Sequence, residues 1–243
     1  MAYQATFQRY EIKYLLTQAQ KEEILRAMAP YMKLDKYGRT TIRNIYFDTD
    51  SYRLIRRSLE KPAYKEKLRV RSYQTASGED PVFVELKKKY QSVVYKRRLV
   101  LPERQVMASF RQGKPLPVSS QIGREIAYFR SYYEGLRPAV FLSYDREAFY
   151  ALDGGAFRVT FDWNILYRTQ ELSLGSPVYG TPLLEKGQTL MEIKTPGGFP
   201  LWMSHTLNKL GIYPTSFSKY GLAYRHMCTN PQENDKRRTL HAC

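Results

Sequence analysis

The chain has 243 residues, of which 43% are hydrophobic, so it can bury one large core or two small ones and is too apolar to be disordered as a whole. Its charge of 39 − 23 = +16 favours phosphate-rich partners such as nucleic acid, nucleotides, polyphosphate or an anionic membrane surface. No apolar run approaches the roughly 18 residues of a membrane helix, and the N-terminus has no signal-peptide core. We therefore expect a cytoplasmic protein, unless a partner recruits it to the inner face of a membrane, with Cys228 and Cys243 as free thiols.

Eight segments alternate apolar and polar residues or are rich in β-branched and aromatic residues, as strands are. These predicted strands are residues 7–15, 41–48, 65–73, 81–90, 92–101, 139–149, 156–163 and 189–195. Between them, Thr17 and Gln20 form a predicted capping box for a helix in 21–32, and Asp50 or Ser51 is expected to cap a helix in 50–60. Further helices are predicted in 102–110, starting at Pro102, and in 119–135, 201–211 and 216–227.

Strands predominate and mostly follow one another or short helices, which favours an α+β fold with an antiparallel sheet over a doubly wound parallel one. We expect one domain over residues 1–228. The polar stretch 229–243 is expected to be a disordered C-terminal tail.

Cations recur on one face of the predicted strands. In "EKLRVRSY", residues 66–73, Arg69 and Arg71 share one face because they lie two residues apart, and the aliphatic residues between them share the other. Six further strands repeat this arrangement with the residues Arg9, Glu11, Lys13, Glu85, Lys87, Lys89, Lys96, Arg98, Tyr144, Arg146, Arg158, Thr160, Asp162, Glu192 and Lys194. A solvated surface would explain one such face. Seven of them opposite apolar faces predict a curved or closed sheet whose interior is lined by the charges.

So many cations at short range repel one another, and a polyphosphate or triphosphate would neutralise them. The carboxylates Glu11, Glu85, Asp162 and Glu192 each lie two residues from a cation on the same predicted face. They are either ligands of Mg²⁺ or Mn²⁺, which bind carboxylate together with phosphate oxygens, or members of cross-strand ion pairs. For the first three, the residues alone leave both interpretations open.

The segments YEIKY, LRVRSY, VFVELKKK, YDREAF, FRVTFD, LMEIK and SFSKYGLAY together resemble the VTC (vacuolar transporter chaperone) domain. This domain is the polyphosphate polymerase branch of the triphosphate tunnel metalloenzyme (CYTH-like) superfamily. The resemblance runs in order from about residue 7 to 226. It implies an antiparallel β-tunnel, closed like a barrel, with a charged lumen and helices packed outside, in which ATP meets a growing polyphosphate chain.

The resemblance also implies roles for individual residues. The catalytic, phosphate-gripping positions would be Lys13, Arg69, Arg71, Lys87, Arg146, Arg158 and Lys219, with Lys96 and Arg98 as further lumen positions and Tyr144 beside the site. Glu192 matches the metal-binding glutamate, so Mn²⁺ or Mg²⁺ is the expected cofactor. Glu11 matches the first residue of the E-x-K opening, which belongs to the metal site in the hydrolytic relatives.

The implied function is transfer of the γ-phosphoryl group of ATP to inorganic polyphosphate. The terminal phosphate of the chain is already an anionic nucleophile, so this reaction needs no strong general base. The sequence offers no obvious catalytic histidine and no P-loop motif: His205 and His226 lie in predicted helices and His241 in the tail.

Three other functions fit part of the pattern. They are a triphosphatase of the same tunnel fold, a catalytically silent polyphosphate-binding module, and a nucleic-acid binder. The inward carboxylates and the lack of a basic helix or base-stacking motif disfavour the last, so no nucleic-acid partner is expected. ATP and polyphosphate are the expected partners, and the resemblance leaves open whether a separate membrane protein docks here.

Overall fold

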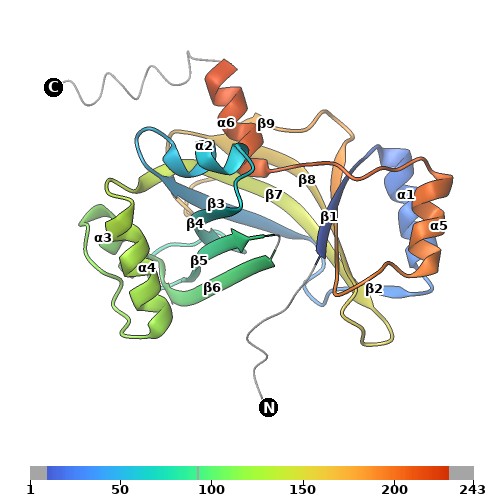
Figure 1. Cartoon of the computed structure of the whole chain (residues 1–243), viewed down its shortest axis with the longest axis horizontal. Helices are drawn as coiled ribbons and strands as arrows, with labels where there is room; N and C mark the ends of the chain where they lie inside the picture. The colour runs from blue at the N-terminus through green and yellow to red at the C-terminus, as the bar shows by residue number, and fades with distance from the viewer. Residues whose placement is uncertain (1–9, 92, 230–243) are drawn as a thin grey trace. The chain divides into compact units, whose positions relative to one another are not determined.

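Antiparallel strands form most of the secondary structure in the computed structural model, which describes residues 10–91 and 93–229 (Figure 1). The strands are β1 (Tyr10–Leu16), β2 (Met32–Leu34), β3 (Thr40–Asp48), β4 (Tyr64–Ser72), β5 (Pro81–Tyr90), β6 (Val93–Pro102), β7 (Arg137–Ala151), β8 (Arg158–Arg168), β9 (Thr181–Pro182) and β10 (Thr189–Thr195). The helices are α1 (Gln18–Met28), α2 (Arg53–Leu59), α3 (Glu103–Arg111), α4 (Gln121–Tyr132), α5 (Leu201–Lys209) and α6 (Lys219–Thr229).

The sheet pairs in the order β1-β10-β8-β7-β3-β4-β5-β6, with β2 beside β7 and β9 beside β8. The predicted α+β fold with an antiparallel sheet is confirmed. Among the described residues this order has two ends, β1 and β6, so backbone hydrogen bonds do not close the sheet into a ring. The expectation of a closed, barrel-like sheet was wrong in this respect.

The chain forms two compact units. The first comprises residues 10–41, 144–165 and 184–217, and the second comprises residues 42–143, 166–183 and 218–229. The expected tail, 229–243, lies outside the described residues except for Thr229, the last residue of α6. Within the residues that the structure describes, no helix combines the length and the apolar character that crossing a membrane requires.

The core of the first unit follows from strand alternation. Ile193 of β10 pairs with Ile12 of β1 on one side and with Val159 of β8 on the other, and Met191 pairs likewise with Tyr14 and Phe161. Helices α1 and α5, which lie side by side in Figure 1, cover this apolar face with Ile24, Met28, Met203 and Leu207. The predicted capping box begins α1: the Gln20 amide donates to Thr17 Oγ1 (3.2 Å) and the Thr17 amide to Gln20 Oε1 (3.0 Å).

The second unit has a core built in the same way. One apolar row crosses four strands through Ile45, Val70, Val84 and Leu99. Helices α3 and α4, beside β5 and β6 in Figure 1, pack on it with Val106, Phe110, Ile126 and Phe129. One face of each strand is therefore committed to the core, and the chemistry of the other face is free to differ.

The start of α2 differs from the prediction. Neither Asp50 nor Ser51 caps it; Tyr52 occupies the cap position in a left-handed conformation without a side-chain cap bond. Instead the buried Asp48 carboxylate accepts the amides of Leu54 (2.9 Å) and Ile55 (3.0 Å). A carboxylate at the end of β3 thus satisfies two of the unpaired amides at the start of the helix.

Candidate functional site

In the first unit, the strand face opposite the core carries charges in ordered rows. We call it the first charged face. One row across β1, β10 and β8 is Glu11, Lys194 and Arg158, and the next is Lys13, Glu192 and Thr160. Directly opposed residues of neighbouring strands have Cβ atoms about 5 Å apart, so the members of each row interact.

Two cations organise the carboxylates of this face. Arg146 of β7 binds Asp162 through two hydrogen bonds, Nε to Oδ1 (2.5 Å) and Nη2 to Oδ2 (2.6 Å), and its Nη2 lies 3.4 Å from Glu192 Oε2. Lys13 Nζ donates to the Phe217 carbonyl (2.9 Å) and lies 3.4 Å from Glu11 Oε1 and 3.8 Å from Glu192 Oε1. Burial alone would lower the pKa of Arg146, but the carboxylates of Asp162 and Glu192 raise it, so this guanidinium stays charged.

The carboxylates of Glu11 and Glu192 fit a divalent cation better than that of Asp162 does. Both approach one ammonium group, which shows that they point into the same space, whereas Asp162 is held by the bidentate pair with Arg146. Among the described residues, no three acidic, histidine or cysteine side chains gather as a metal cluster. Mg²⁺ is commonly bound by one or two carboxylates together with substrate phosphates, and this face offers that donor set.

In the second unit, the equivalent face of β4, β5 and β6 is crowded with cations. We call it the second charged face. Three lysines oppose one another directly, Lys67 against Lys87 and Lys87 against Lys96. Like charges placed directly opposite one another destabilise a sheet, so an anion bound at this row would reduce the repulsion among the three lysines. The adjacent row is Tyr46, Arg69, Glu85 and Arg98.

The buried Glu85 carboxylate holds four of these cations together. Its oxygens lie 2.8 Å from Arg69, 3.8 Å from Arg71, 2.6 Å from Lys96 and 2.5 Å from Arg98. Four positive charges against one negative charge leave 4 − 1 = +3. Burial alone would raise the pKa of Glu85, but Arg69 and Arg71 hold it well below its usual range. Glu85 is thus an ion-pair partner, and the charge that it leaves uncompensated would attract polyanions.

The remaining predicted residues have different surroundings. Tyr144 is buried, and its ring lies 5.2 Å from the guanidinium carbon of Arg146. Arg158 is exposed at the start of β8. Lys219 is the first residue of α6, and Ser218 just before it accepts hydrogen bonds from Lys67 (3.1 Å) and from the Gly221 amide (3.1 Å). The start of α6 is thereby attached to the second charged face.

Two residues of the second charged face were missed. Lys67 belongs to the lysine row, and Tyr46 accepts a hydrogen bond from Arg69 (3.0 Å) while its ring stacks on Tyr220 at 4.8 Å. Burial raises the pKa of Tyr46, but Arg69 and Lys67 outweigh it and lower the pKa to about 8. The alternation of side chains between the two faces of a strand could have identified both residues, because Lys67 precedes the core residue Leu68 and Tyr46 precedes the core residue Phe47.

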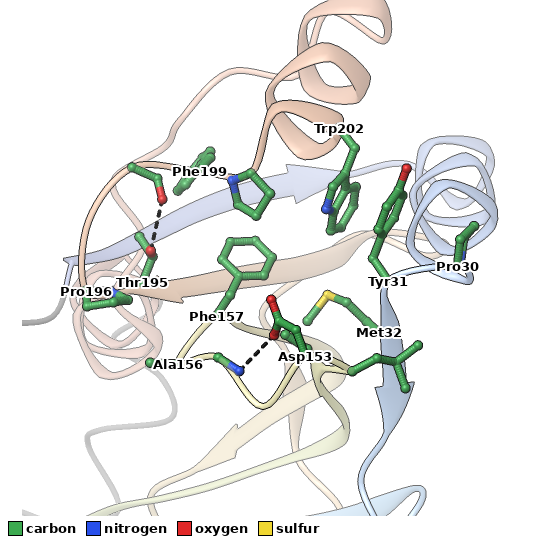
Figure 2. A pocket seen from close by; sticks show the side chains of 15 residues that line it. Pro30, Tyr31, Met32, Asp153, Ala156, Phe157, Thr195, Pro196, Phe199 and Trp202 are labelled. Carbon is green, nitrogen blue, oxygen red and sulfur yellow. Dashed lines mark hydrogen bonds between the residues drawn. The ribbon is translucent and has the colours of Figure 1, made fainter.

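An apolar pocket of about 680 Å³ lies elsewhere in the first unit (Figure 2). Tyr31 and Trp202 stack at its wall with ring centroids 4.8 Å apart, and Phe157 meets Trp202 edge-on at 6.0 Å. None of the predicted site residues lines it. The pocket is therefore lined by other residues than the charged face and offers mainly apolar surface rather than phosphate ligands.

Two solved structures share the fold at low sequence identity. A candidate adenylate cyclase of Bacillus halodurans superimposes with a TM-score of 0.53 and 14% identity, over 86% of this chain and 92% of that chain. A candidate adenylyl cyclase of Hippeastrum, reported with a dominant triphosphatase activity, superimposes with a TM-score of 0.53 and 16% identity, over 87% of this chain and 93% of that chain. At these identities the likeness shows a shared fold and no more. None of the curated proteins matches the sequence.

The sequence itself matches one protein family over nearly all of the described residues. The matched region, residues 8–228, begins two residues before β1 and ends in α6, and it contains both charged faces. This confirms the resemblance on which the sequence-based site was built. The chain belongs to the VTC domain family.

Proposed function

We propose that the protein is a metal-dependent polyphosphate polymerase, which transfers the γ-phosphoryl group of ATP to inorganic polyphosphate. Membership of the VTC domain family supports the substrate class. The observation that carries the proposal is the second charged face, where Lys67, Lys87 and Lys96 oppose one another and Glu85 is outnumbered by its cations. Such a face is stabilised by a linear polyanion that spans several strands.

In the proposed reaction, the terminal oxygen of polyphosphate attacks the γ-phosphorus of ATP. One P–O bond forms, the bond from the γ-phosphorus to the β–γ bridging oxygen breaks, and ADP leaves. Arginine and lysine side chains bind the non-bridging oxygens and keep the two phosphates in line. Arg146 suits this role, because its bidentate pair with Asp162 fixes the orientation of the guanidinium before substrate arrives.

The chemistry needs positioning more than proton transfer. The described histidines lie in α5 and α6, and the incoming phosphate carries its own negative charge. A divalent cation held by Glu11 and Glu192 would add charge neutralisation at the phosphate oxygens when bound. Lys13, between these carboxylates, would reduce the repulsion between them.

The test is incubation of the purified protein with ATP, a short polyphosphate primer and Mn²⁺ or Mg²⁺, with products resolved by gel electrophoresis and ³¹P NMR. A ladder of lengthening chains with equimolar ADP is the expected result. Release of orthophosphate without chain growth would instead assign a triphosphatase, the activity reported for the Hippeastrum protein of the same fold. Binding of polyphosphate without turnover would leave a binding module.

A further inference from the structure

The hydroxyl group of Thr160 lies at the centre of the first charged face without a hydrogen-bond partner. Thr160 is 7% exposed, and its Oγ1 is one of the few buried polar side-chain atoms in the described chain for which the protein supplies no partner. Its neighbour across the ladder is Glu192, on the same face. Burying a hydroxyl without a partner destabilises a fold, and a ligand that accepts its hydrogen bond would offset this penalty.

The polar groups around Thr160 direct their bonds elsewhere. Lys13 donates to the Phe217 carbonyl and faces the carboxylates of Glu11 and Glu192. Arg146 binds Asp162 and approaches Glu192. Lys13 and Arg146 are thus already paired with carboxylates, whereas the donor of the Thr160 hydroxyl is unused within the described protein.

We propose that the Thr160 hydroxyl is a further phosphate-binding group, which donates a hydrogen bond to a non-bridging oxygen of a triphosphate or polyphosphate. The inference rests on the proposed function, since it adds a residue to that same phosphate site. A phosphate oxygen accepts hydrogen bonds and donates none once ionised, so it matches the unused donor of the Thr160 hydroxyl. A neutral donor here adds no charge to a face that already carries Lys13, Arg146 and Arg158.

The experiment uses two substitutions of matched shape. Thr160→Val keeps the β-branched outline of the side chain and removes the hydroxyl, whereas Thr160→Ser keeps the hydroxyl. Binding of tripolyphosphate is measured by calorimetry at low salt in the presence of EDTA, so that no divalent cation contributes. Thr160→Val is expected to bind about tenfold more weakly than wild type, and Thr160→Ser within about twofold of it.

Thermal unfolding of the ligand-free proteins separates a binding role from a structural one. Because the hydroxyl has no partner within the described protein, Thr160→Val should unfold at or above the wild-type midpoint. Ser143 is the matched control. Its buried Oγ also lacks a partner in the described chain, but parity places it on the strand face opposite Tyr144. Ser143→Ala should bind tripolyphosphate as wild type does.

Four outcomes would overturn the inference. These are equal binding by wild type and Thr160→Val, a loss of ligand-free stability in Thr160→Val, an equal loss of binding in Ser143→Ala, and an effect that appears only when Mn²⁺ is added. The last would assign the hydroxyl to the metal rather than to phosphate. If the wild-type protein binds no tripolyphosphate at all, the proposed function itself fails, a result distinct from failure at Thr160 alone.

Discussion

Lys96 carries a charge that depends on what binds beside it. Burial lowers its pKa to about 8 although Glu85 lies 2.6 Å away, and Arg98 and Arg69 on the same face add to the lowering. A bound phosphate would favour the ammonium form and raise this pKa. At a pH between the pKa of Lys96 in the free protein and its higher pKa in the complex, Lys96 is largely neutral before phosphate binds and charged afterwards.

We therefore expect the protein to take up a proton when it binds tripolyphosphate at about pH 8.5, just above the lowered pKa of Lys96. Calorimetry in two buffers of different ionisation enthalpy measures the uptake. Lys96→Met should remove most of it. Lys88→Met is the control, because Lys88 lies on the opposite strand face, 3.8 Å from Glu66. Identical uptake by wild type and Lys96→Met would contradict this prediction.

A substitution at Glu192 should affect metal-dependent turnover and tripolyphosphate binding differently. Its carboxylate lies 3.8 Å from Lys13 and 3.4 Å from Arg146, so Glu192→Gln leaves both cations with less compensation. Metal-dependent turnover should fall by about 10²-fold or more. Tripolyphosphate binding in EDTA should stay the same or tighten, because a charge that repels phosphate is gone.

Glu147→Gln is the matched control for this substitution. It removes the same charge from the first unit at a position where Glu147 pairs with Lys21 (3.6 Å), on the strand face opposite Arg146. Its steady-state rates should stay near those of wild type. Equal losses in the two variants would show that the total charge of the unit, rather than Glu192, controls turnover.

At the scale of elements, adjacent residues of β6 provide a test of which strand face binds substrate. Arg98 points toward Glu85, whereas Arg97 binds Glu125 of α4 (3.1 Å). Arg98→Gln and Arg97→Gln change the net charge equally. We expect Arg98→Gln to weaken tripolyphosphate binding about tenfold and Arg97→Gln to leave it nearly unchanged, since only the first removes a charge-assisted contact. Equal weakening would mean that binding follows net charge rather than the face.

Much of the fold could be predicted because each strand buries one face. Alternation across Val70, Val84 and their neighbours located the long strands within a few residues. Strands β2 and β9, at three and two residues, are too short to show a period. The true cap of α2 was missed because Asp48 reaches the helix through a turn, beyond the local spacing that defines a capping box.

The sequence predicts which strand face carries the site residues, but not which of these residues contact one another. Parity places Arg69, Glu85 and Arg98 on one side of their strands, but only the register of β4, β5 and β6 shows that they oppose one another. Parity could not decide whether Glu85 binds metal or cations. Alternation also places Tyr46 on this face, but its stacking on Tyr220 of α6 is a contact between distant segments that no local pattern reveals.

At the scale of the whole molecule, the charge of +16 is a source of instability that a polyanion would relieve. Tripolyphosphate at 100 times its Kd should therefore stabilise the protein by about 2.7 kcal/mol. Scanning calorimetry at low salt should show the rise in Tm, and 1 M NaCl should largely abolish it because the Debye length shrinks to about 3 Å. Orthophosphate at matched ionic strength should produce a smaller rise, since it cannot span several strands; an equal rise would point to general screening.

The division of each strand into an apolar and a charged face also governs which changes in length the protein can accept. Inserting one residue near the start of β10 would move every later side chain to the opposite face, sending Glu192 and Lys194 into the core and Met191 and Ile193 out of it. Because β10 is hydrogen-bonded on both sides, by β1 and β8, the extra residue has no free edge at which to bulge outward. Two inserted residues would restore the alternation, and additions to the β7–β8 turn would leave it untouched. Length variation compatible with this fold therefore belongs in the connections, and in whole steps of two within the strands.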